Sequence, residues 1–159
     1  MTLQPIRLVS AEDHADGAVD DPKVVRLPND ADPSTLKDRL DGIERIDLDF
    51  PQFHDGRAFS QAFLLRRRLG FKGDIRATGD VLIDQLVQME RTGFSSAALK
   101  PGVDAADAQR QFERFPAFYQ GDAVETAPRF ARTEAGSPSS IRPCPPPGRG
   151  ASRKESTAP

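Results

Sequence analysis

Apolar residues in the middle of this chain follow two periods that alternate along the sequence. Ile46, Leu48 and Phe50 occupy every second position, as in a strand with one buried face, whereas Leu82 and Leu86 are spaced as on one side of a helix. This pattern indicates four consecutive strand–helix units. The predicted strands cover residues 23–27, 43–49, 74–78 and 96–99, and the predicted helices begin near residues 32, 55, 80 and 104.

Regular alternation of strands and helices predicts an α/β fold with a parallel sheet, because each helix returns the chain to the same end of the sheet. A closed (β/α)8 barrel needs about 250 residues, roughly twice what these units provide. Two architectures stay open at this point, a half-barrel and a small open sheet. In both, functional groups are expected at the carboxyl ends of the strands.

The segments on either side of this body have a different composition. Residues 1–22 are rich in acidic side chains and poor in large apolar ones, so we expect a poorly ordered lead-in with one edge strand near residues 6–9. Residues 121–159 hold seven of the chain's 14 prolines, and we expect them to be disordered. The sequence therefore predicts one domain over residues 23–120.

Composition narrows the class of partner. Lys and Arg number 22 against 24 Asp and Glu, a balance that argues against a dedicated nucleic-acid-binding protein. No apolar run approaches the roughly 18–20 residues that span a bilayer, and none resembles a signal peptide, so we expect a cytoplasmic protein. The single cysteine, Cys144, lies in the proline-rich segment and excludes an intramolecular disulfide. With only two histidines besides, no metal site is expected, and no cofactor motif is evident.

Polar side chains gather where the predicted strands end. A carboxylate at such a place can act as a general base, and an arginine there can bind an anion through two parallel hydrogen bonds. The catalytic candidates are Asp49, Asp55, Arg57, Asp80 and Asp84. The ligand-binding candidates are Asn29, Asp30, Ser60, Gln61, Arg76, Gln85 and Lys100.

Structural interpretations compete with these assignments. Asp55 and Asp80 stand where helices begin and could serve as N-caps, while Asp84 and Gln85 could favour the helix dipole. The run at residues 66–68 is three arginines, which we interpret as a solvated helix face rather than a phosphate site.

Two acids in a buried strand need partners of their own. Asp47 and Asp49 lie in one predicted strand, and parallel strands are usually buried on both faces. Arg57 and Arg76 are the expected partners.

Three stretches carry a resemblance to a known family. Residues 27–30 (LPND), 49–66 (DFPQFHDGRAFSQAFLLR) and 79–86 (GDVLIDQL) resemble the DUF934 family of small bacterial proteins. The resemblance covers roughly residues 23–120, and the proline-rich segment departs from it.

The resemblance implies a pathway rather than a reaction. Members tend to be encoded beside sulfite reductase, which implies an accessory protein of assimilatory sulfite reduction that acts with sulfite reductase, its electron supply or another sulfate-assimilation protein. Since no cofactor motif is evident, a partner would hold any redox cofactor. The alternative is a small oxidoreductase or anion-binding enzyme that uses the Asp and Arg side chains at the strand ends. An exposed sheet edge also favours self-association or a capping partner.

Overall fold

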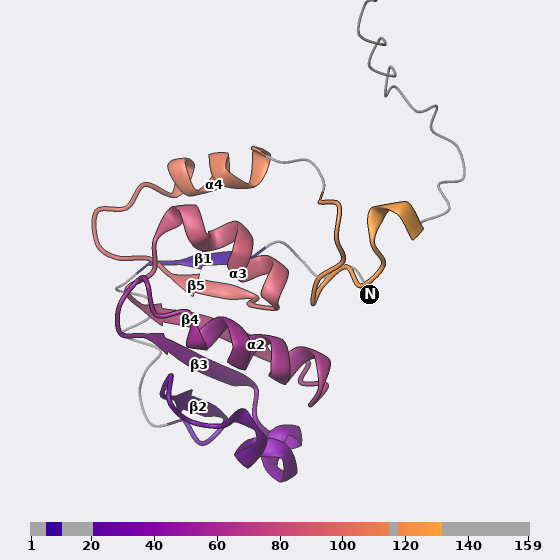
Figure 1. Cartoon of the computed structure of the whole chain (residues 1–159). Coiled ribbons are helices and arrows are strands. Elements are labelled where there is room, and N and C mark those ends of the chain that lie inside the picture. Colours follow the sequence, from indigo (N-terminus) through magenta and orange to yellow (C-terminus); the bar gives the residue numbers. More distant parts are fainter. Residues whose placement is uncertain (1–5, 11–20, 115–117, 132–159) are drawn as a thin grey trace, which may run out of the picture.

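The computed structural model describes residues 6–10, 21–114 and 118–131 (Figure 1). Residues 1–5 and 11–20 of the predicted lead-in and residues 132–159 of the predicted disordered segment lie outside the described residues. No helix in the described ranges is long and apolar enough to cross a bilayer.

A five-stranded sheet forms the centre of the molecule, and all of its strand pairs are parallel. The α/β prediction is therefore confirmed, and so is the edge strand near residues 6–9, which pairs with the last strand. The spatial order is β1-β5-β4-β3-β2. The strands are β1 (Arg7–Val9), β2 (Val24–Leu27), β3 (Arg45–Phe50), β4 (Asp74–Gly79) and β5 (Ser96–Ala98).

Helices begin close to the positions that the sequence indicates. Asp32 and Asp104 act as N-caps, since their carboxylates accept hydrogen bonds from the backbone N–H groups of Ser34 and Ala106, both at 2.8 Å. Asp80 is not an N-cap, and the helix after it begins three residues later. The helical elements are η1 (Pro33–Gly42), α2 (Arg57–Arg67), η2 (Ile83–Gln85), α3 (Leu86–Thr92), α4 (Ala105–Glu113) and η3 (Arg129–Ala131), where η denotes a 3-10 helix.

The order of the strands bears on the choice between a half-barrel and a small open sheet. Strands β2 to β5 follow one another across the sheet in chain order, and α2 and α3 lie over the same face (Figure 1). A doubly wound fold would reverse direction and place helices on both faces. The winding of β2 to β5 is thus that of a half-barrel, whereas β1 joins the sheet beside β5, and the sheet is open with β1 and β2 as its edges.

The two faces of the sheet differ in chemistry. Ile46, Leu48 and Phe50 of β3 face the helices and are fully buried, and the Phe50 ring lies 5.2 Å from that of Phe59 on α2. Alternate residues form the opposite side, which we call the polar sheet face, an unusual feature because parallel sheets are normally apolar on both sides. Its polar members are Arg7, Arg26, Arg45, Asp47, Asp49, Asp74, Arg76, Thr78 and Ser96.

Residues 118–131 lie against the body rather than apart from it. The Ala123 amide donates to the Arg91 carbonyl at 2.9 Å, and Arg91 Nε forms an ion pair with Asp122 at 3.0 Å. The Arg91 guanidinium also lies 4.1 Å from the centre of the Phe118 ring. The segment that the sequence assigns to the tail therefore begins with residues that contact α3.

Candidate functional site

Asp55 and Arg57, two of the catalytic candidates, bind each other at the carboxyl end of the sheet. Arg57 donates from Nε to Asp55 Oδ1 at 3.0 Å and from Nη2 to Oδ2 at 2.6 Å, and Asn29 Nδ2 donates to Oδ2 at 2.6 Å. These bonds, chiefly those from Arg57, lower the pKa of Asp55 from 3.8 to about 2. Such a weak base is poorly suited to accept protons near neutral pH, so this group links two loops rather than supplying acid–base chemistry.

A second set of candidates holds the backbone of Phe53 from both sides. The Phe53 amide donates to Asp80 Oδ2 at 3.0 Å, and its carbonyl accepts from Gln85 Nε2 at 2.8 Å. Lys100 forms an ion pair with Asp80, and its hydrogen bond is the main reason why the pKa of Asp80 is lowered. The Phe53 side chain nevertheless remains 48% exposed. We call this arrangement the Phe53 clamp.

The remaining candidates include a buried side chain that joins two segments of the chain and several exposed side chains. Gln61 is buried and donates from Nε2 to the carbonyls of Pro28 and Ala31, both at 2.8 Å, which fixes α2 to the loop after β2. Ser60 and Asp84 are exposed, and their side chains have no hydrogen bond or ion pair among the described residues. Asp30 is also exposed; the pKa of Arg57 is raised chiefly by its hydrogen bond and charge interaction with Asp55, and the charge of Asp30 adds a smaller contribution.

Arg76 lies on the polar sheet face rather than among the loops. It donates from Nε to Ser96 Oγ at 3.1 Å and pairs with Asp74 at 3.4 Å. Since Arg57 pairs with Asp55, neither expected partner of Asp47 is engaged with it. Asp47 instead pairs with Arg45 of its own strand, at 3.0 Å.

A pocket of about 430 Å³ opens on the polar sheet face at the carboxyl ends of β2, β3 and β4. Asp49 is the sequence-predicted candidate that lines it, and Arg26 and Thr78 were missed. Their signal was the alternation of polar with apolar positions in each strand, which places them on the side away from the helices. The lining residues are Arg26, Leu27, Pro28, Asp47, Asp49, Thr78 and Gly79.

Gly79 is required for the shape of this pocket. Its φ is +87°, and a Cβ atom there would lie 2.4 Å from the Phe50 carbonyl oxygen and 2.8 Å from Asp49 Oδ1. A larger residue would therefore clash with the backbone of β3 and with a side chain of the pocket.

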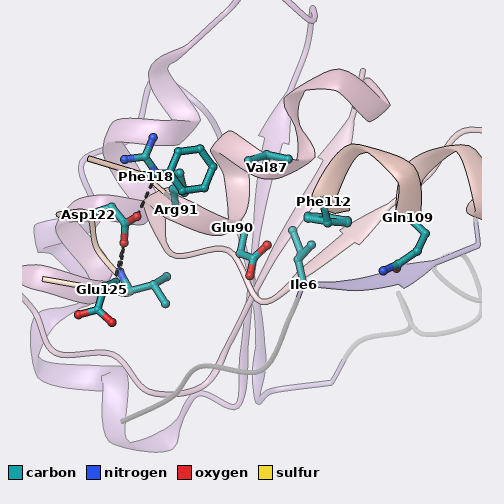
Figure 2. A pocket seen from close by; sticks show the side chains of 10 residues that line it. Ile6, Val87, Glu90, Arg91, Gln109, Phe112, Phe118, Asp122 and Glu125 are labelled. Carbon is teal, nitrogen blue, oxygen red and sulfur yellow. Dashed lines mark hydrogen bonds and ion pairs between the residues drawn. The ribbon is translucent and has the colours of Figure 1, made fainter. Parts of the chain in front are cut away.

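A second pocket, of about 390 Å³, lies at the opposite end of the sheet, between α3, α4 and the segment after residue 118 (Figure 2). Glu90 lines it beside Ile6, and burial, with a smaller contribution from the charge of Asp122, raises the pKa of Glu90. Within the described ranges, no group of three or more His, Cys, Asp or Glu side chains is arranged to hold a metal ion. The two pockets described above are therefore considered as sites for a ligand rather than for a metal ion.

Comparison with known proteins places the chain in a family. A family model with the description "Bacterial protein of unknown function (DUF934)" matches residues 24–130. The chain belongs to the DUF934 family. Neither curated proteins nor solved structures gave a match.

In this DUF934 protein, the stretches that carry the resemblance are those that hold the loops together. Residues 49–66 contribute Asp55, Arg57 and Gln61, and residues 79–86 contribute Asp80 and Gln85. The match extends ten residues beyond position 120, into the segment that contacts α3.

Proposed function

We propose that this DUF934 protein is an accessory of assimilatory sulfite reduction that binds sulfite reductase or its electron supply through the exposed Phe53. The pathway is suggested by the family resemblance. The mode of action is suggested by one observation, a half-exposed aromatic ring whose backbone is held by hydrogen bonds on both sides.

The Phe53 clamp has the physical properties of a binding anchor. Aromatic side chains are enriched at the centres of protein interfaces, where they fill apolar pockets of the partner. Association costs conformational entropy, and a segment that is already ordered loses less of it. Because Asp80 and Gln85 fix the backbone on either side of the ring, Phe53 can enter a partner's pocket at a low entropic cost.

The neighbourhood of Phe53 indicates what the partner surface should offer. The ring packs edge-on against His54, with centroids 5.3 Å apart, and the ion pair of Lys100 with Asp80 lies beside its backbone. We expect an apolar pocket for the ring, surrounded by polar groups that can hydrogen-bond with this rim.

Replacing Phe53 with Ala tests the proposal, and Phe63 provides a matched control because it is also exposed, by 42%, but lies on α2. In a strain that lacks the native gene, the tagged wild-type protein should co-purify with sulfite reductase or its electron donor. It should also restore growth on sulfate as the sulfur source. Growth on cysteine should not require the protein at all. Phe53→Ala should weaken the complex at least about tenfold, and Phe63→Ala should leave it unchanged.

Two results would contradict the proposal. One is a wild-type protein that enriches no sulfur-assimilation protein, together with a deletion strain that grows normally on sulfate. The other is Phe53→Ala binding its partner as tightly as Phe63→Ala does.

The alternative, an anion-binding enzyme, has less support from the geometry. Arg57, Arg76 and Lys100 each form an ion pair with a carboxylate of the chain. A sulfite or sulfate ion that bound at any of these three side chains would have to compete with the carboxylate already paired there, whereas the Phe53 ring needs no such rearrangement.

A further inference from the structure

We propose that the pocket on the polar sheet face binds a small zwitterion, with its ammonium group at Asp47 and Asp49 and its anionic group at Arg26. The inference does not rest on the proposed function, because it involves neither Phe53 nor a protein partner.

Asp47 supplies the strongest indication of a cationic ligand group. Its side chain is 2% exposed, and neither carboxylate oxygen accepts a hydrogen bond in the described structure. Asp47 pairs with Arg45 through an Nε–Oδ1 contact of 3.0 Å, but this contact does not have hydrogen-bond geometry. A buried carboxylate oxygen without a donor is costly, and an ammonium group brings three donors.

Two further acceptors stand beside Asp47 in the same pocket. Asp49 lies two residues along β3 on the same face and is exposed, and its side chain has no ion pair or hydrogen bond among the described residues. Thr78 pairs with Asp49 in the register of β3 and β4, and its hydroxyl donates to the Leu48 carbonyl at 3.2 Å. Because its proton is used there, the Thr78 oxygen keeps lone pairs that can accept from an ammonium group.

Arg26 supplies the opposite charge across the pocket. It is exposed, its side chain has no ion pair or hydrogen bond within the described ranges, and it lies opposite Asp47 in the register of β2 and β3. From the usual strand spacing and rise, its Cα lies about 8 Å from that of Asp49. Arg26 and Asp49 form no direct ion pair, so a ligand charged at both ends can satisfy both.

The charge balance favours a zwitterion over an ion of either sign. A simple anion that approaches Arg26 meets the carboxylate of Asp49, and a simple cation that approaches Asp49 meets Arg26. A zwitterion with the correct polarity gains both attractions and leaves the net charge of the pocket unchanged. Leu27 and Pro28 provide apolar contacts for the carbon chain between its charged groups, and the volume lies in the range of small-molecule sites.

Binding of four small probes to the full-length protein tests this inference. β-Alanine and taurine carry both charges, ethylamine carries only the cation, and propionate carries only the anion. Isothermal titration at low ionic strength, up to about 10 mM probe, covers millimolar dissociation constants. We expect saturable binding of the zwitterions at least about tenfold tighter than that of either singly charged probe.

Two variants separate the halves of the site. Arg26→Gln should reduce β-alanine binding to the level of ethylamine, and Asp49→Asn should reduce it to the level of propionate. Arg67→Gln and Asp38→Asn change exposed residues outside the pocket and should leave binding unchanged. Thermal melts should show that all four variants are folded, since each changes an exposed side chain.

Three results would overturn the inference: no saturable binding of β-alanine or taurine, equal affinity for a zwitterion and a singly charged probe, or equal losses in the pocket variants and their controls. None of these results bears on whether Phe53 binds a protein partner.

Discussion

At Asp55, both carboxylate oxygens are occupied by donors from Arg57 and Asn29, and the side chain is 19% exposed. A carboxylate with a lowered pKa stabilises the folded state above the pKa of the unfolded chain. That contribution is lost as the pH falls through the folded value. For Asp55 the loss occurs as the pH falls from about 3.8 towards 2. The ion pair of Asp55 with Arg57 thus contributes to the acid stability of the loops at this end of the sheet, as does that of Asp80 with Lys100.

Replacing Arg57 with Gln should raise the pKa of Asp55 from about 2 towards its ordinary value near 3.8, because the main cause of the shift is removed. A ¹³C NMR titration of the Asp55 carboxyl carbon measures this directly. Arg67→Gln removes an exposed arginine from the same helix and should leave the titration unchanged. An unchanged pKa in Arg57→Gln would show that Asn29 and the backbone suffice to hold the carboxylate ionised.

The run at residues 66–68 shows how one helix is attached to the sheet. Arg67 and Arg68 are exposed, as the interpretation of a solvated face predicts, but Arg66 is largely buried and the interpretation is wrong for it. Its guanidinium donates to the carbonyls of Phe71, Gly73 and Gly93, at 2.7–2.8 Å. One side chain therefore joins α2 to the segments that lead into β4 and β5.

Arg66→Met should lower the free energy of unfolding by about 3 kcal/mol, because it leaves three carbonyl groups without their donor. Arg67→Met, the matched control on the same helix, should change it by no more than about 0.5 kcal/mol. Urea unfolding followed by circular dichroism gives both values. Equal losses in the two variants would mean that water replaces the Arg66 donors without cost.

Across the whole molecule, residues 118–131 close the amino end of the sheet and form part of the second pocket (Figure 2). Asp122 organises this segment: its Oδ1 accepts from the amides of Val124 and Glu125, at 2.9 and 2.7 Å, and its Oδ2 pairs with Arg91. Its charge also contributes to the raised pKa of Glu90. The attachment of the segment and the pocket beside it therefore depend on the same carboxylate.

Asp122→Ala should detach this segment while the sheet remains folded. The Ala123 amide, which donates to the Arg91 carbonyl, should exchange with solvent at least about tenfold faster in native-state hydrogen exchange. The amides of β3 and β4 should keep their protection. Glu113→Ala, at the exposed end of α4, serves as the control and should alter neither. Unchanged exchange at Ala123 would show that Asp122 does not hold the segment.

Local chemistry explains which features of the fold could be predicted. The alternation of Ile46, Leu48 and Phe50 reports the buried face of a strand, and Asp32 and Asp104 cap helices through bonds to residues only two positions away. The prediction that Asp80 caps a helix is wrong because its partner is distant in the sequence. It stands where a cap belongs, but its carboxylate binds the backbone of Phe53, 27 residues earlier in the chain.

The sequence by itself thus determined the elements, the parallel α/β class and the gathering of polar groups at the strand ends, because all of these follow from local periodicity. Only the tertiary structure decided which charges neutralise one another. Arg57 and Arg76 pair with near neighbours, Gln61 reaches carbonyls about 30 residues away, and Arg26 and Asp49 remain unpaired across a pocket. The contacts of Gln61 and the separation of Arg26 from Asp49 depend on strand register and loop path, which bring distant residues close together and which the spacing of apolar residues does not specify.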